Sequence, residues 1–245
     1  MCYNYFVPNP PFNELTDVWN RYVTEDSLVL YEALKKDIEA QKTLKRYLAS
    51  PLPSDASREI KTADFVNKYN CLVILAALEH LEEARKNKNG VKGIKGFFDE
   101  IKYTISGETL TLQEFESLGV RMGVPEVHFG YNCASKGCPP FRRESYTEEN
   151  VIGMLNENAR IYLAKKTRVE GKKIRTSDLF FWFPTDFFDI NYVVHPLKFR
   201  EKLVAYLLAK LPAEHEAISI LKEAPSTLII LPARDWDWGL NEATE

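Results

Sequence analysis

Residues 57–85 read SREIKTADFVNKYNCLVILAALEHLEEAR, and this stretch decides the fold. Its apolar spacing predicts a helix, and its middle, residues 71–78, has no polar residue on any side. A helix that is apolar all round must be buried all round, so the rest of the chain has to pack around it. This is the longest uninterrupted apolar run in the chain, and it falls far short of the ~20 residues that a membrane-spanning helix needs.

The composition around this helix is that of an ordinary globular protein. The chain has 245 residues, 45% hydrophobic and 27% charged, which excludes a disordered, collagen-like or coiled-coil protein. The net charge of −3 gives no electrostatic reason to expect nucleic acid or an anionic membrane as a partner. The first residues, MCYNY, show neither a basic nor an apolar signal region, which predicts a soluble, cytoplasmic protein.

Outside the buried helix, the pattern predicts more helices and a few short strands. Apolar periodicity indicates two helices over residues 11–50. Thr111 and Glu114 form a capping box that should start a helix over 112–121. Further helices are expected from Ser145 and over 196–211 and 212–222, and strands at 102–105, 127–131, on both sides of Gly171 and at 227–231.

These elements predict an α+β fold, mostly helical, in which one structural domain surrounds a small β-sheet. Residues 1–55 are expected to form N-terminal helices that pack on a core of residues 56–245. No internal repeat and no long linker divides the chain.

Residues 127–140, VHFGYNCASKGCPP, hold the densest group of reactive side chains. His128, Asn132, Cys133, Ser135 and Cys138 bring an imidazole, a carboxamide, a hydroxyl and two thiols into a short segment. If 127–131 is a strand, His128 and Asn132 share one face, which makes that face a candidate site wall. A thiol becomes nucleophilic when an imidazole lowers its pKa, so His128 with either cysteine could form a Cys-His pair.

The cysteine spacing leaves other interpretations open. Cys133 and Cys138 could form a structural disulfide in an oxidising compartment, or could be inert buried thiols. A zinc site of His128 and both cysteines lacks the usual cysteine spacing and an obvious fourth ligand. No metal and no other cofactor is therefore expected.

Two asparagine side chains lie just before the apolar run of the buried helix. Asn67 and Asn70 are three residues apart and lie on one helical face. There they would either anchor the helix or orient a substrate carbonyl, and the anchoring role is favoured because a buried amide must be fully hydrogen-bonded wherever it sits. Cys71 precedes a wholly apolar run, which favours core packing over reactivity.

Four further residues are weaker candidates for binding. Glu116 and Arg121 lie five apart on the short helix after Thr111, which favours a solvated face. Asp186 follows an aromatic stretch that contains Trp182. Its carboxylate would either orient an imidazole, as in a catalytic triad, or cap the local turn, and the turn cap is favoured.

Several motifs together resemble a known family, the domain of unknown function numbered 547. The resemblance runs from about residue 60 to the C-terminus. Its most specific part is the segment from His128 to Pro140. The motifs are Asn67-x-Tyr69-Asn70, Ile105-Ser106-Gly107, Thr111-Leu112-x-x-Phe115-Glu116, Arg121, His128-Phe129-x-x-Asn132-Cys133-Ala134-Ser135-x-x-Cys138-Pro139-Pro140, Phe181-Trp182-Phe183, Asp186-Phe187 and Asp237-Trp238-Gly239-Leu240-Asn241.

The resemblance carries limited information about function. Relatives usually have a small apolar residue in place of Cys71, often a histidine in place of Leu75, and typically Glu-His where this chain has Glu116-Ser117. His128 is therefore the only histidine of this chain that matches the family motif. Family members also occur fused to glutaredoxin-like domains, which hints at thiol chemistry, and to coiled-coil regions, which hints at scaffolding.

Three functions remain open on the sequence. The leading one is a thiol-dependent hydrolase or acyltransferase of papain-like or transglutaminase-like type, in which Cys133 or Cys138 attacks an amide or thioester of a peptide or protein substrate. His128 would be the base, and Asn132 or Asn70 would orient the imidazole or stabilise the oxyanion. The second is a non-catalytic protein-interaction module, in which the cysteine loop is structural and the aromatic segment 180–188 forms a docking surface. The third is a redox protein in which the two cysteines cycle between dithiol and disulfide.

Overall fold

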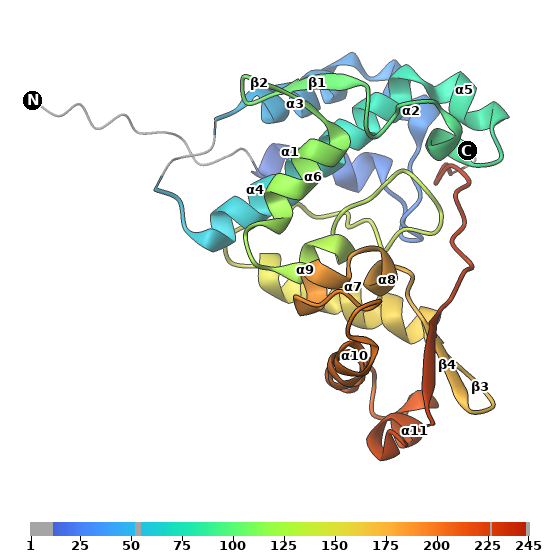
Figure 1. Ribbon diagram of the computed structural model, residues 1–245. Coiled ribbons are helices and arrows are strands. Elements are labelled where there is room, and N and C mark those ends of the chain that lie inside the picture. The colour runs from blue at the N-terminus through green and yellow to red at the C-terminus, as the bar shows by residue number, and fades with distance from the viewer. Residues whose placement is uncertain (1–11, 52–54, 226, 244–245) are drawn as a thin grey trace, which may run out of the picture.

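The computed structural model describes residues 12–51, 55–225 and 227–243, and it confirms a mostly helical α+β fold with two small sheets (Figure 1). The predicted N-terminal segment 1–55 lies partly outside the described residues. The helices are α1 (Phe12–Tyr22), α2 (Tyr31–Lys36), α3 (Ile38–Ala49), α4 (Arg58–Glu79), α5 (Leu81–Lys86), α6 (Leu112–Val120), α7 (Val151–Lys166), α8 (Leu179–Trp182), α9 (Pro184–Phe188), α10 (Pro196–Lys210) and α11 (Ala217–Glu223), with short 3₁₀ helices η1 (Gly90–Gly93) and η2 (Pro125–Phe129).

Helix α4 is the central element that the apolar run predicts. The Ser57 hydroxyl accepts a hydrogen bond from the Ile60 amide and caps its N-terminus. Residues 71–77 are buried on every side, beneath α3, α6 and α7. His80 caps the end of α4 and precedes the first residue of α5, so the predicted stretch 57–85 forms two helices. None of the described helices is long and apolar enough to cross a bilayer.

The buried side chains form two hydrophobic cores. The first involves α1 to α6, and the second involves α8 to α11 and strand β4. Helix α7 contributes Val151 and Leu155 to the first core, and Ala159 and Leu163 to the second. Figure 1 shows α1 to α6 in the upper half of the molecule and α10 and α11 in the lower half, with α7 between them.

The two sheets lie in different halves. Strands β1 (Lys102–Ile105) and β2 (Glu108–Thr111) form an antiparallel hairpin. Strands β3 (Arg168–Glu170) and β4 (Lys173–Thr176) form the hairpin predicted around Gly171, whose φ of 62° is easily adopted by glycine. Strand β5 (Ile229–Pro232) pairs parallel to β4. From β5 the chain runs back to the upper half and ends beside α5 (Figure 1).

The predicted strand at 127–131 is wrong. The amides of Gly130 and Tyr131 both donate to the carbonyl oxygen of Val127, and Pro125 begins the 3₁₀ helix η2. Residues 127–132 are all buried, so burial does not alternate as on a half-exposed strand. His128 and Asn132 therefore do not share a strand face.

Candidate functional site

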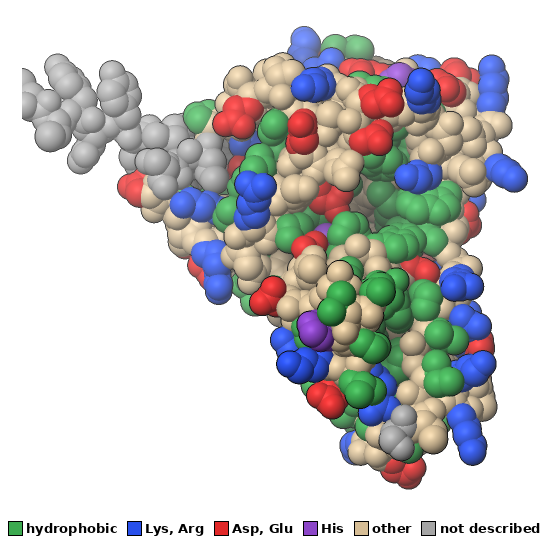
Figure 2. All heavy atoms as spheres, in the orientation of Figure 1, with side chains coloured by type: hydrophobic (Ala, Val, Ile, Leu, Met, Phe, Trp, Pro, Cys, Tyr) green, Lys and Arg blue, Asp and Glu red, His purple; other side chains and the backbone are tan. Residues whose placement is uncertain are grey.

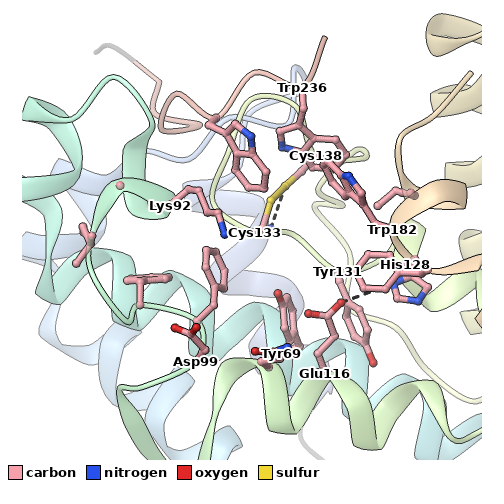
Figure 3. Close-up of a pocket in the computed structure, with 18 of the residues that line it drawn as sticks. Tyr69, Lys92, Asp99, Glu116, His128, Tyr131, Cys133, Cys138, Trp182 and Trp236 are labelled. Atoms are coloured by element: carbon pink, nitrogen blue, oxygen red, sulfur yellow. Dashed lines mark hydrogen bonds and ion pairs between the residues drawn. A yellow bond between two sulfur atoms is a disulfide. The ribbon is translucent and has the colours of Figure 1, made fainter. Parts of the chain in front are cut away.

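A cleft of about 450 Å³ opens where the two cores meet. Helices α4 and α6 and residues 92–99 form the part of its wall that belongs to the first core. The opposite wall comes from α8, the cysteine loop and the C-terminal indoles of Trp236 and Trp238. Figure 2 shows this face hollowed between the two halves, with hydrophobic side chains along the hollow. Figure 3 shows the polar groups among these aromatic walls.

A disulfide between Cys133 and Cys138 forms part of the wall. The Ser135 hydroxyl oxygen lies 3.1 Å from Cys133 Sγ and 3.3 Å from Cys138 Sγ. It accepts a hydrogen bond from Trp236 Nε1 at 3.0 Å, so its own proton is free to be donated to a sulfur. The Cys133 amide also donates to Cys138 Sγ at 3.0 Å. The Cys133 amide thus donates to Cys138, and the Ser135 hydroxyl is within reach of both sulfurs.

The cysteine loop is held by the C-terminal segment. Asn132 Oδ1 accepts hydrogen bonds from the Ala134 amide at 2.9 Å and from Asn241 Nδ2 at 3.1 Å. Ala134 adopts a φ of 57°, a left-handed conformation that an alanine holds only at a cost. A side chain at Gly137 would lie 2.8 Å from the Asp237 amide nitrogen, too close for any residue but glycine. Asn132 therefore positions the loop; it was predicted to orient an imidazole or stabilise an oxyanion.

His128 lies buried at the inner end of the cleft. Its ring stacks on Phe183, with 4.1 Å between the ring centroids. Nε2 is 2.9 Å from Asp186 Oδ2, and Nδ1 is 3.6 Å from Glu116 Oε1. Asp186 therefore orients the imidazole, which is the alternative that the sequence disfavoured. Within the described part of the chain, no histidine nitrogen hydrogen-bonds to Cys133 or Cys138.

Glu116 faces the cleft, and the structure does not place it on the solvated face that the sequence favoured. Burial raises the pKa of its carboxyl above the ordinary 4.5, while the nearby charge of His128 lowers it and that of Asp186 raises it. The Tyr69 hydroxyl also hydrogen-bonds to the carboxyl and lowers the pKa. A carboxyl with a raised pKa keeps its proton to a higher pH than a solvent-exposed glutamate does.

Compared with the unmodified protein, the Glu116→Gln variant should gain in free energy of unfolding as the pH rises. A raised pKa means that the folded protein holds the proton more tightly than the unfolded chain, so stability from this group is complete below about pH 4.5 and is lost as the pH rises through the folded-state value. The loss is about 1.4 kcal/mol for each unit by which the pKa is raised. Urea unfolding of both proteins from pH 4 to pH 7 measures it.

The matched control is Glu114→Gln in the same helix. A hydrogen bond from the Thr111 amide lowers the pKa of Glu114, so its stabilisation is present at neutral pH and lost as the pH falls. The two variants should therefore move in opposite directions. A Glu116→Gln difference that is constant with pH, or that follows Glu114→Gln, contradicts the raised pKa.

The remaining predicted residues lie in different places. Asn67 donates to the carbonyl oxygen of Tyr146 and accepts from its amide, so it anchors α4 away from the cleft. Asn70 anchors the backbone of residues 130–132 in the same way. Arg121 is an exposed residue at the end of α6. Trp182 lines the cleft, whereas Ser135 is buried behind the disulfide.

Several cleft residues were missed by the sequence analysis. Trp236 and Trp238 line the cleft, although they were not among the predicted site residues. Lys92 belongs to a Lys-, Asn- and Gly-rich stretch that predicts an ordinary loop, and no local signal shows that it faces a cleft. The aromatic segment 180–188, considered as a docking surface, has Phe180, Phe187 and Phe188 in the second core. The described residues contain no group of three or more His, Cys, Asp or Glu side chains that could hold a metal ion.

The structure is that of a mostly helical α+β protein. One aromatic cleft holds both the disulfide and a buried histidine that is paired with a carboxylate. Residues 53–163 match the family model described as protein of unknown function, DUF547, which is the family that the sequence motifs resemble. No curated protein and no solved structure matches the chain. The papain-like or transglutaminase-like architecture therefore has no support.

Proposed function

We propose that the protein is a thiol–disulfide oxidoreductase whose reactive group is the Cys133–Cys138 disulfide. One observation carries this proposal: the disulfide is partly exposed in the wall of an aromatic cleft, and hydrogen-bond donors converge on its sulfurs. A disulfide that only braces a loop has no need of such donors. Donors directed at a sulfur stabilise the thiolate that forms when the S–S bond breaks.

The hydrogen bonds favour one direction of cleavage. A substrate thiolate attacks Cys133 Sγ, a new S–S bond forms to that sulfur, and Cys138 Sγ leaves with the electron pair of the broken bond. The Cys133 amide and the Ser135 hydroxyl stabilise this leaving thiolate. A second substrate thiolate then attacks the substrate sulfur of the mixed disulfide, so Cys133 leaves as a thiolate. The substrate is oxidised to a disulfide by two electrons, and the protein is reduced to its dithiol.

The substrates we propose are thiols of peptides or small molecules, because a cleft of about 450 Å³ suits a small group. We also propose that the protein works in the cytoplasm. Disulfides of cytosolic proteins are usually catalytic or redox-sensing, since the thiol pools there keep most other cysteines reduced, and a reactive disulfide in a cleft fits this class.

The reduction potential tests this function. Equilibration of the Cys2→Ser protein with thiol–disulfide buffers, followed by alkylation and mass spectrometry, should give a potential above about −300 mV, the range of labile disulfides. Ser135→Ala should lower the potential, because the reduced form loses a donor to its thiolate. The same substitution should slow alkylation of Cys138 by iodoacetamide at mildly acidic pH.

Ser145→Ala is the matched control. Ser145 is as buried as Ser135, but it hydrogen-bonds to Thr16 and Phe12 and does not contact a sulfur. Its loss should leave the potential unchanged. Cys71 should stay unmodified in the folded protein, because it is fully buried and burial raises the pKa of its thiol. A potential below about −300 mV that is insensitive to Ser135→Ala would show that the disulfide is structural.

The His128–Asp186 pair supports acyl transfer as a second candidate. An imidazole oriented by a carboxylate is the base that a cysteine hydrolase needs, and His128 shares the cleft with the cysteines. The candidate requires a reduced cysteine and an imidazole nitrogen turned away from its carboxylate. Thioester hydrolysis by the reduced protein, absent in the oxidised protein and in His128→Ala, would favour it over the redox function.

A further inference from the structure

Lys92 presents a positive charge to the cleft beside the disulfide. Its Nζ lies 5.7 Å from the ring centroid of Trp238 and 5.9 Å from that of Phe98. Figure 3 shows the side chain extending from its wall toward the disulfide. Trp238 packs on Trp236, at 5.5 Å between centroids, and Trp236 donates to the serine that contacts both sulfurs. Aromatic contacts therefore link the ammonium group to the reactive bond.

The placement of Lys92 is built into the backbone. Gly90 begins η1 with a φ of 51°, and a side chain there would lie 2.6 Å from the carbonyl oxygen of Trp238. This close backbone contact fixes η1 against the C-terminal segment, two residues before Lys92. The backbone from which the Lys92 side chain extends is thus fixed by a contact that only glycine permits.

The charge of Lys92 is available to a ligand. Among the described residues, Lys92 forms no ion pair, whereas five other lysines form salt bridges. Two carboxyls also line the cleft. Asp99 lies on the exposed rim, and Glu116 is engaged by His128 at the inner end. Neither neutralises Lys92 by direct contact.

We infer that the cleft selects thiols that carry a carboxylate, and that Lys92 binds this carboxylate. The inference deepens the proposed function and rests on it. The ammonium group pairs with the carboxylate, the indoles of Trp236 and Trp238 cover the carbon chain of the substrate, and the thiolate is delivered to Cys133 Sγ. Lys92 is a specificity-determining residue, because it contacts the part of the substrate that does not react.

Three small thiols of different charge test the selectivity. Disulfide exchange is measured with 3-mercaptopropionate, 2-mercaptoethanol and cysteamine. Each rate constant is divided by the fraction of the thiol that is ionised. The anionic thiol should react fastest. Lys92→Gln should lower the rate ratio of 3-mercaptopropionate to 2-mercaptoethanol about fivefold, Lys92→Arg should retain the ratio, and Lys92→Glu should favour cysteamine.

Lys88→Gln is the matched control, because Lys88 lies four residues before Lys92, is exposed and carries the same charge, but does not line the cleft. Its loss should leave the ratio unchanged. A second readout needs no thiol chemistry: 3-(methylthio)propionate should change the fluorescence of the protein, since three of its four tryptophans line the cleft. Lys92→Gln should weaken this binding about fivefold.

The two readouts separate this inference from the proposed function. Fast exchange with a ratio that Lys92→Gln leaves unchanged overturns the inference and keeps the redox function. Slow exchange with every thiol overturns the redox function, whereas Lys92-dependent binding of 3-(methylthio)propionate would still support the carboxylate site. Binding that Lys88→Gln weakens as much as Lys92→Gln overturns the assignment to Lys92.

Discussion

Asp64→Asn should lower the free energy of unfolding by about 3–5 kcal/mol, the cost of leaving one member of a buried ion pair without its partner. Asp64 Oδ2 lies 2.8 Å from Lys68 Nζ, and these side chains are only 4% and 2% exposed. Nζ also donates to the carbonyl oxygen of Ser50 at 2.7 Å and to Ser106 Oγ at 2.8 Å. The amide variant keeps the shape of the side chain but leaves the buried ammonium uncompensated. Denaturant unfolding monitored by circular dichroism measures the loss.

An exposed ion pair provides the control. Lys42 and Glu39 are also 2.8 Å apart, but their side chains are 64% and 82% exposed. Glu39→Gln should therefore cost less than about 1 kcal/mol. The double variant Asp64→Leu/Lys68→Met should cost less than the sum of its single substitutions, because it leaves no buried charge. Equal losses for Asp64→Asn and Glu39→Gln would mean that Asp64 is not ionised beside Lys68.

This ion pair also supports the cleft. Lys68 ties α4 to the end of α3 through Ser50, and to the β1–β2 turn through Ser106. Helix α6 follows β2 directly and carries Glu116 into the cleft. The buried pair therefore holds together the elements on which one cleft wall is built. We expect the Asp64→Asn protein to lose part of its cleft geometry as well as stability.

The elements that the sequence predicted correctly are those that depend on residues close together in the chain. The apolar run of α4, the capping box of Thr111 and Glu114, and the hairpin around Gly171 each depend on residues within a few positions, and the structure confirms them. The prediction of a strand at 127–131 is wrong because alternating apolar and polar residues indicate a strand only when one of its faces is exposed to solvent. That segment is buried throughout, so tertiary packing decided its conformation.

The candidate site depends on contacts that no local pattern contains. Asp186 reaches His128 across 58 residues, and Trp236 reaches Ser135 across 101. From the sequence, the cysteine loop was recognisable by its chemistry, yet the partner of each group was not. The pairing of Cys133 with Cys138 was one of several alternatives, because a spacing of five residues permits a disulfide without requiring one. The tertiary fold, and not the spacing, decides which of these alternatives for the two cysteines occurs.

Asn70→Leu should lower the free energy of unfolding by about 2–5 kcal/mol, because it leaves two buried backbone groups without partners. Asn70 Nδ2 donates to the carbonyl oxygen of Gly130 at 3.0 Å, and Oδ1 accepts from the Asn132 amide at 2.9 Å. The side chain is 2% exposed, and leucine of similar size leaves little room for water to replace these bonds. Denaturant unfolding gives the magnitude.

The same substitution should act on the cysteine loop, since residues 130–132 lead directly into Cys133. The Asn132 amide should exchange hydrogen faster than in the unmodified protein, and the disulfide should react faster with thiols because its loop opens more often. Asn156→Leu on α7 is the control: its amide group donates to the Ile152 carbonyl of its own helix and accepts from Lys210, which keeps Glu126 as a partner, so its loss should cost only about 1 kcal/mol. If Asn70→Leu costs as little as Asn156→Leu and leaves the exchange rate of Asn132 unchanged, the amide does not hold the cysteine loop.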